Sequence, residues 1–290
     1  GEIFALSCAL TWAIAIILWR KSGESVHPVA LNLFKCVLAI VLIFPTMRLM
    51  GESPFQSAPA ADYLILAVSG MLGIGIADTL LFMSLNRLGA SLVAVVSCLY
   101  SPSVILLSVI WLGESLSVWQ IAGTVSVISA VLLVSSPKAR GHLAPKDFIW
   151  GAFLGVSAII CIAIGIVMVK PILERSSVLW VAQVRLMSGA AFLVIYLLLH
   201  RQRNRILSTL FIPTGWVFTL TGSFSGNYLS MIFWLAGMKF TQASIAAVLN
   251  QTSNIFVFIL ALIFLKEEIN LPKVVAIGLA AAGAFLVTFG

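Results

Sequence analysis

Charged side chains are scarce in this sequence. They make up 9% of the 290 residues, whereas hydrophobic residues make up 61%, and the mean hydropathy is +1.12. A soluble domain of this composition would expose more apolar surface than water tolerates, so the proportions exclude an ordinary soluble enzyme or binding domain. They are typical of a chain whose solvent is a lipid bilayer.

Metal-ligating and nucleophilic residues are also scarce. The three histidines fall in connecting segments without the spacing of metal ligands: His27, His142 and His200. The four cysteines fall inside apolar stretches, where a small side chain packs well: Cys8, Cys36, Cys98 and Cys161. No nucleophile–base pair or phosphate-binding glycine loop is present. The sequence therefore predicts no metal, no cofactor, no disulfide and no catalytic centre.

The formal net charge of +7 does not predict a nucleic-acid partner. Basic residues are scattered through short polar segments such as 138–146 and 200–205. Lipid headgroups and the preference of basic loops for the cytoplasmic side of a membrane explain this pattern better. We therefore expect membrane lipids and a small-molecule substrate as partners, and no nucleic acid.

Long apolar stretches dominate the chain. A helix needs roughly 20 such residues to cross a bilayer, and the sequence offers ten candidates. They are residues 3–19, 29–50, 62–84, 91–112, 117–135, 148–169, 178–199, 214–237, 244–265 and 272–289. The first resembles the other nine, so it is predicted to be a transmembrane helix rather than a removable signal peptide. Six of the eight tryptophans fall near the ends of these stretches, where indole rings prefer the membrane interface.

The chain contains an internal duplication. At an offset of 150 residues, the intramembrane Lys35 matches Arg185; at 153, Gly73 matches Gly226 and Glu114 matches Glu267. These matches predict a first five-helix repeat at 1–135, a linker at 136–147 and a second five-helix repeat at 148–290. Because five is odd, the second repeat must enter the membrane from the opposite side. The predicted fold is an all-α membrane protein with ten transmembrane helices in two inverted repeats, and a substrate site between them.

The motifs of both halves resemble those of the drug/metabolite transporter superfamily, specifically its EamA-type ten-helix exporters. The shared features are a basic residue early in the second helix of each repeat, an Ala-Ser pair opening the fourth helix, and a glutamate ending it. They correspond here to Lys35 and Arg185, to 90–91 and 243–244, and to Glu114 and Glu267. The resemblance implies a metabolite exporter in a bacterial inner membrane. Two departures are Ile255, in place of the proline that would match Pro102, and Lys266 before Glu267.

Three charged residues fall deep inside the predicted helices, where each needs a partner or a watery cavity. Lys35 and Asp78 lie at similar depth, so they are predicted to pair, either as a fixed structural ion pair or in proton or substrate coupling. Arg185 has Met231 where the repeat would place its acid. It is expected either to reach headgroups or helix carbonyls, or to bind an anionic group of the substrate.

Hydrogen-bonding side chains gather on the fourth helix of each repeat and on the third helix of the second. The predicted substrate-binding residues are Ser97, Tyr100, Ser101, Arg185, Asn227, Tyr228, Asn250, Gln251 and Asn254. Such groups persist in a membrane as interhelical hydrogen bonds or as the lining of a polar cavity, and the second interpretation is preferred. Glu114 and Glu267 lie at helix ends, as boundary or gate contacts.

These observations predict a secondary transporter, an exporter of a small polar or amphipathic metabolite such as an amino acid, working by alternating access. Coupling to protons or to a counter-substrate is compatible with it. Alternatives are a multidrug pump for lipophilic cations, disfavoured because the first helix lacks a buried acid, and a membrane-embedded enzyme. The loop charges put both termini outside the cytoplasm and the resemblance implies the reverse, so the sequence leaves the orientation open.

Overall fold

The computed structural model describes residues 1–112, 117–134, 143–240, 243–267 and 270–289, and all the regular secondary structure in these ranges is helical. The first half contains α1 (Glu2–Ser22), α2 (Pro28–Leu49), α3 (Ala60–Gly70), the π-helix η1 (Met71–Ile76), α4 (Ala77–Leu88), α5 (Ala90–Ser97), α6 (Tyr100–Leu112) and α7 (Val118–Val134).

The second half repeats this order. It contains α9 (Pro145–Arg175), α10 (Val178–Leu199), α11 (Arg203–Ser208), two short turns η2 (Thr209–Phe211) and η3 (Pro213–Gly215), α12 (Trp216–Ser223), the π-helix η4 (Phe224–Ser230), α13 (Met231–Phe240), α14 (Ala243–Leu265) and α15 (Leu271–Phe289). Each of the ten apolar stretches predicted from the sequence falls on one or more of these helices.

By length and composition, five of the described helical runs qualify as candidate membrane spans. They are Glu2–Ser22, Pro28–Leu49, Ala60–Leu88, Pro145–Arg175 and Val178–Leu199. A sixth is counted if Arg203–Phe211 and Trp216–Gly237, which meet at 94°, form one broken span. The remaining apolar helices are shorter. Many of the large side chains on the outside of the bundle are apolar, with Leu199 81% and Ile3 80% exposed, as a lipid environment requires.

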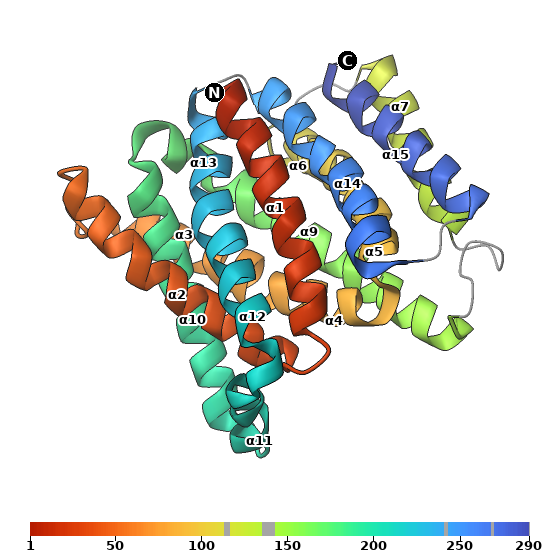
Figure 1. Cartoon of the computed structure of the whole chain (residues 1–290). Helices are drawn as coiled ribbons and strands as arrows, with labels where there is room; N and C mark the ends of the chain where they lie inside the picture. The colour runs from red at the N-terminus through yellow and green to blue at the C-terminus, as the bar shows by residue number, and fades with distance from the viewer. Residues whose placement is uncertain (113–116, 135–142, 241–242, 268–269, 290) are drawn as a thin grey trace.

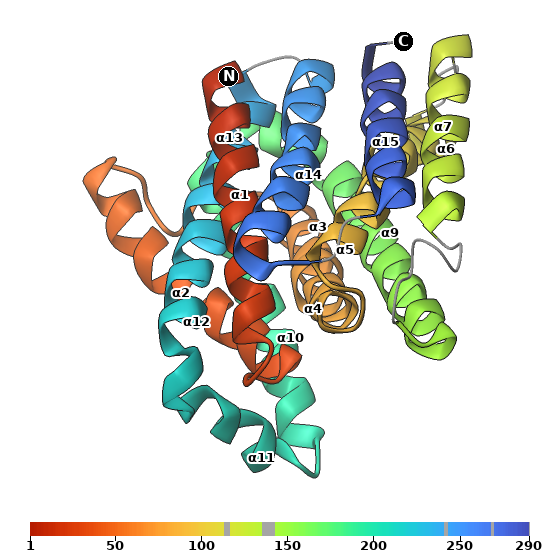
Figure 2. The same ribbon diagram turned by 45° about the vertical axis from the view of Figure 1, so that its right-hand side comes forward.

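The packing of the helices has an internal symmetry (Figures 1 and 2). Helix α1 packs against α14, α12 and α13, and its counterpart α9 packs against α5, α6, α3 and α4. The helices α2 and α10 pack against each other, and so do α7 and α15 along one side of the molecule. Every one of these contacts therefore has its equivalent when the halves are exchanged, as a duplicated chain would produce.

The two π-helices occupy matching positions, since Met71 of η1 and Phe224 of η4 are 153 residues apart, the offset seen in the sequence. Each widened turn carries a glycine where helices approach closely. A Cβ at Gly226 would lie 2.3 Å from the Trp19 ring. A π-turn also frees backbone carbonyls, and Asn32 of α2 donates its amide to those of Ile74 (2.8 Å) and Gly75 (3.1 Å). The sequence did not predict these turns.

Candidate functional site

A cavity of about 160 Å³ lies between the halves, where α1, η1 and α9 meet η4, α13 and α14. Seven of the predicted substrate-binding residues line it: Ser97, Tyr100, Arg185, Asn227, Asn250, Gln251 and Asn254. Asp78 and Gly73 complete part of its wall. The structure thus brings together side chains from both repeats, and the cavity wall runs from Cys8 to Asn254 in the chain.

Lys35 and Asp78 contact each other beside this cavity. The Nζ atom of Lys35 lies 2.5 Å from Oδ2 of Asp78 and 3.0 Å from Oδ1 of Asn227. The rings of Trp19 and Phe82 each have their centroid 5.7 Å from the ammonium group. Lys35 is 1% exposed, whereas Asp78 lines the cavity. The charge of the lysine is therefore neutralised and shielded, and only the acid can be reached from the site.

Arg185 on α10 is equally buried but forms no ion pair with an acid among the described residues. It is 2% exposed, and its Nε and Nη1 atoms lack a hydrogen-bond partner there. The guanidinium lies 5.6 Å from the centre of the Trp234 ring, and a Cβ at Gly73 would lie 3.3 Å from Nη2. A buried cation in this state carries a large desolvation cost. An anionic group of a ligand would remove that cost by pairing with it.

Two neutral groups in the cavity wall are also unpaired. The Tyr100 hydroxyl and the Oδ1 atom of Asn250 are buried without a hydrogen-bond partner among the described residues. Native proteins pair nearly all their buried polar atoms, so unpaired atoms that face one cavity point to a ligand. With Arg185, they offer donors for an anion and an acceptor for a donor group of a solute.

Ser101, Gln251 and Asn254 bond to one another instead. Gln251 donates to the Ser101 hydroxyl at 2.8 Å, and Asn254 donates to Gln251 Oε1 at 2.7 Å and to the Cys98 sulfur at 3.3 Å. This network ties α14 to the first repeat at the junction of α5 and α6. Ser101 itself is outside the cavity wall. Interhelical hydrogen bonds were the alternative interpretation of these residues from the sequence. The structure contains such bonds for all three.

Tyr228 does not line the cavity, contrary to the expectation from the sequence. Its hydroxyl bonds to that of Thr46 on α2 at 2.7 Å. Both residues lie in the π-helix η4, where neighbouring side chains still point in different directions, so with Asn227 turned toward Lys35 its neighbour faces elsewhere. Glu114, predicted as a gate or helix-end contact, lies outside the described residues.

Two aromatic residues of the cavity were missed in the sequence. Trp12 of α1 and Trp234 of α13 both line it. A signal existed for Trp12, which lies in the middle of the predicted helix 3–19, but not for Trp234, which lies three residues from the end of 214–237. An indole ring placed away from the interface must find another role. Here it supplies apolar, polarisable walls for the organic part of a solute.

Glu267 follows α14 and binds the start of α5. Its carboxylate accepts a hydrogen bond from the backbone N–H of Ala90 at 2.7 Å and from that of Ser91 at 3.1 Å, and it also contacts the Ser91 hydroxyl. Helix N-termini have unpaired N–H groups and a partial positive charge, which a carboxylate satisfies. The residue therefore joins the two repeats at one end of the bundle.

We expect Glu267→Ala to destabilise the protein by about 1–2 kcal/mol, as loss of a capping carboxylate does. Glu267→Gln should lose less, because an amide oxygen still accepts one bond. The measurement is thermal unfolding in detergent, with Glu24→Ala as the control because that exposed carboxylate contacts only Lys21 among the described residues. Equal melting temperatures for Glu267→Ala and the control would contradict the capping role.

Comparisons with known proteins agree with this architecture. Residues 1–136 and 149–289 each match the EamA-like transporter family. The chain belongs to that family. This EamA-like transporter is 26% identical to an uncharacterized transporter of Archaeoglobus fulgidus over 279 residues, or 95% of this chain and 93% of the relative. It is 28% identical to the uncharacterized transporter YvbV of Bacillus subtilis over 173 residues, or 55% of each chain.

A solved crystal structure shares the fold of the EamA-like transporter. The two superpose with a TM-score of 0.70 over 98% of this chain and 96% of the other, at 17% sequence identity. Two matched EamA regions imply duplicated halves. The protein is accordingly a multi-pass membrane transporter and not an enzyme, and it has a transported substrate.

Proposed function

We propose that this chain is a secondary transporter that exports a small amphipathic metabolite with an anionic group, such as an amino acid, by alternating access. The observation that carries the proposal is the buried, unpaired guanidinium of Arg185 in the central cavity. A carboxylate matches its planar fork of donors. The Tyr100 hydroxyl and Asn250 Oδ1 then meet other polar groups of the solute, while Trp12 and Trp234 contact its apolar part.

The volume of the cavity favours a solute of this size. Sites for drug-sized ligands occupy about 300–1,000 Å³, and this cavity has about 160 Å³. A multidrug pump for lipophilic cations also requires an available acid. Asp78 reaches the wall, but its charge is matched by Lys35, and Arg185 adds an unmatched positive charge. The cation-pump alternative is therefore disfavoured by charge as well as by size.

We further propose ten membrane crossings in two inverted five-helix repeats, with boundaries at 1–135 and 148–290 and a linker at 136–147. The paired π-helices and the exchange symmetry of the helix contacts support the repeats. In such a fold the site lies between halves that can exchange conformations and open to either side. A bacterial inner (plasma) membrane is the expected location, and proton coupling would act through Asp78, the acid that faces the site.

The test is uptake of labelled solutes into liposomes that contain the purified protein. We expect counterflow of one or more small carboxylate-bearing solutes, such as amino acids, and none of a lipophilic cation such as tetraphenylphosphonium. Arg87→Gln protein serves as the matched control for variants of Arg185 and should transport normally. Arg87 is exposed, lies away from the cavity and bonds only to the Met83 carbonyl of its own helix among the described residues. Transport of the cation with no flux of any anion-bearing solute would contradict the proposal.

A further inference from the structure

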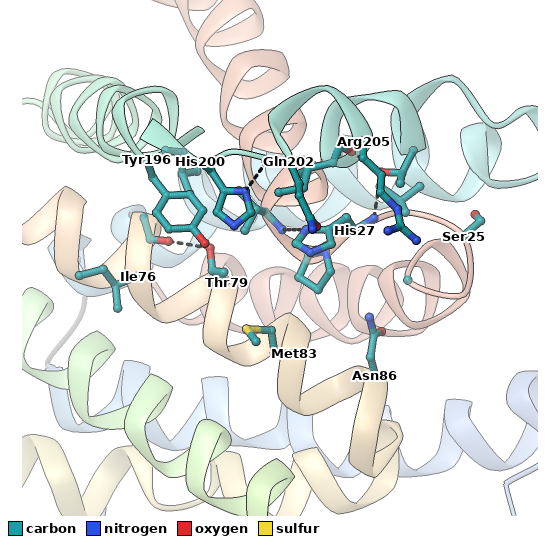
Figure 3. Close-up of a pocket in the computed structure, with 18 of the residues that line it drawn as sticks. Ser25, His27, Ile76, Thr79, Met83, Asn86, Tyr196, His200, Gln202 and Arg205 are labelled. Atoms are coloured by element: carbon teal, nitrogen blue, oxygen red, sulfur yellow. Dashed lines mark hydrogen bonds between the residues drawn. The ribbon is translucent and has the colours of Figure 1, made fainter. Parts of the chain in front are cut away.

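A second and larger cavity, of about 720 Å³, opens at the end of the bundle where the α1–α2 connection meets α10 and α11 (Figure 3). We call it the vestibule. The π-helix η1 lies between it and the central cavity. Gly75 and Ile76 of η1 face the vestibule, while Gly73 and Ile74 face the central cavity. The side chains that line the vestibule have no role in the central site.

Three basic side chains from three separate segments of the chain line the vestibule. His27 ends the α1–α2 connection, His200 follows α10, and Arg205 is on α11. Figure 3 places the two imidazoles near each other, with Arg205 beside them. None of the described residues gives the Arg205 guanidinium a hydrogen bond or an ion pair. The only acid in the wall, Glu24, already contacts Lys21 at 3.4 Å.

Both histidines are held in the same orientation by their Nδ1 atoms. His27 Nδ1 accepts a hydrogen bond from the backbone N–H of Val29 at 3.3 Å, which caps α2, and His200 Nδ1 accepts one from the N–H of Gln202 at 3.1 Å. In a neutral imidazole whose Nδ1 accepts, the proton is on Nε2. Each ring therefore keeps an Nε2–H donor that no described residue uses.

The remaining wall adds no further charge. Helix α4 contributes Thr79, Met83 and Asn86, and α10 contributes Tyr196, whose ring packs at 5.5 Å from that of His200. Partial desolvation lowers the pKa of His27 from its ordinary 6.5, and the neighbouring His200 lowers it further. The lowered pKa favours the neutral His27 ring that its hydrogen bond from Val29 requires.

We propose that the vestibule is a second binding site, for a small anion with a carboxylate or phosphate group, held by Arg205 and the Nε2–H groups of His27 and His200. The site does not depend on the function of the central cavity, since it is made of different residues at the end of the bundle.

The test is residue-resolved carbethoxylation of histidine by diethylpyrocarbonate, followed by mass spectrometry, on the full chain in zwitterionic nanodiscs. Inorganic phosphate is the probe. At about ten times its dissociation constant it should slow modification of His27 and His200 roughly tenfold, because only the unoccupied fraction reacts. The measurement is made at about pH 8, where free imidazole is neutral and reacts with the reagent. Reactivity of His142 provides the internal reference.

Three variants decide the assignment. Arg205→Gln should remove the protection, whereas the control Arg203→Gln, on the same helix but outside the vestibule, should keep it. Arg185→Met should also keep it, which separates this site from the central one. Unchanged modification rates with phosphate, or full protection in Arg205→Gln, would overturn the proposal. Equal protection by phosphatidylglycerol nanodiscs without phosphate would assign the site to lipid headgroups and overturn the small-anion assignment.

Discussion

Replacing Arg185 with methionine should abolish transport and leave the folded protein at least as stable as before. The guanidinium is buried without an acid, so its removal relieves a desolvation cost in the empty protein. A bound solute loses its charge-assisted hydrogen bonds, worth about 1.5–3 kcal/mol, so its affinity should fall roughly 10- to 100-fold. Solute uptake and the melting temperature are the two measurements.

A second variant tests the same idea without removing the arginine. Met231 lines the cavity at the position where the first repeat has Asp78. Met231→Asp should give Arg185 the partner that Lys35 already has. We expect transport to be lost although the arginine remains, because the cation is then neutralised before the solute arrives. Met231→Asn, a neutral residue of the same shape, should transport far better than Met231→Asp. Equal transport by these two variants would count against an anion-binding Arg185.

The largest effect on stability should come from replacing one partner of the Lys35–Asp78 ion pair. Removing one partner of a buried ion pair leaves an unmatched charge and typically costs about 3–5 kcal/mol, so Lys35→Met and Asp78→Asn should each reduce the yield of folded protein severely. The double variant should recover much of it, since no charge remains buried. Yield and thermal unfolding of all three proteins measure this.

The same series separates a structural pair from a coupling pair. If Asp78 only neutralises Lys35, the double variant should transport with an unchanged pH dependence. If Asp78 also carries a proton, the double variant should fold but lose the pH dependence of its transport, since Asp78 is the member of the pair that faces the cavity. Two single variants as stable as the double one would contradict the ion pair as a source of stability.

The helices and their duplication could be read from the sequence because both depend on patterns along the chain. Apolar length identified ten helical stretches, although not the short polar α11 or the break between α5 and α6. The matches of Lys35 with Arg185 and of Glu114 with Glu267 gave the offsets of 150 and 153. The contact between Lys35 and Asp78 also followed, because two buried charges at similar depth leave few other solutions. Composition and spacing suffice for these statements.

The direction in which each side chain points around its helix could not be predicted as well from the sequence. The π-turns insert extra residues at η1 and η4, so the faces beyond them rotate relative to a regular helix. Asn227 accordingly turns to Lys35 while Tyr228 turns to Thr46. The pattern of polar residues on α14 also could not separate Asn250, whose Oδ1 is unpaired, from Asn254, which bonds to Gln251. That distinction depends on which atoms the neighbouring helices bring near.

The central claim is that the cavity between the repeats opens to both sides of the membrane in turn. Ser97 lines it and is half-buried, so a Ser97→Cys variant with the four native cysteines replaced by alanine provides a reporter. The measurement is its reaction with an impermeant anionic methanethiosulfonate, added separately to each side of oriented vesicles. We predict modification from either side and protection by a transported solute. Modification from one side only, or from neither, would contradict alternating access through this cavity.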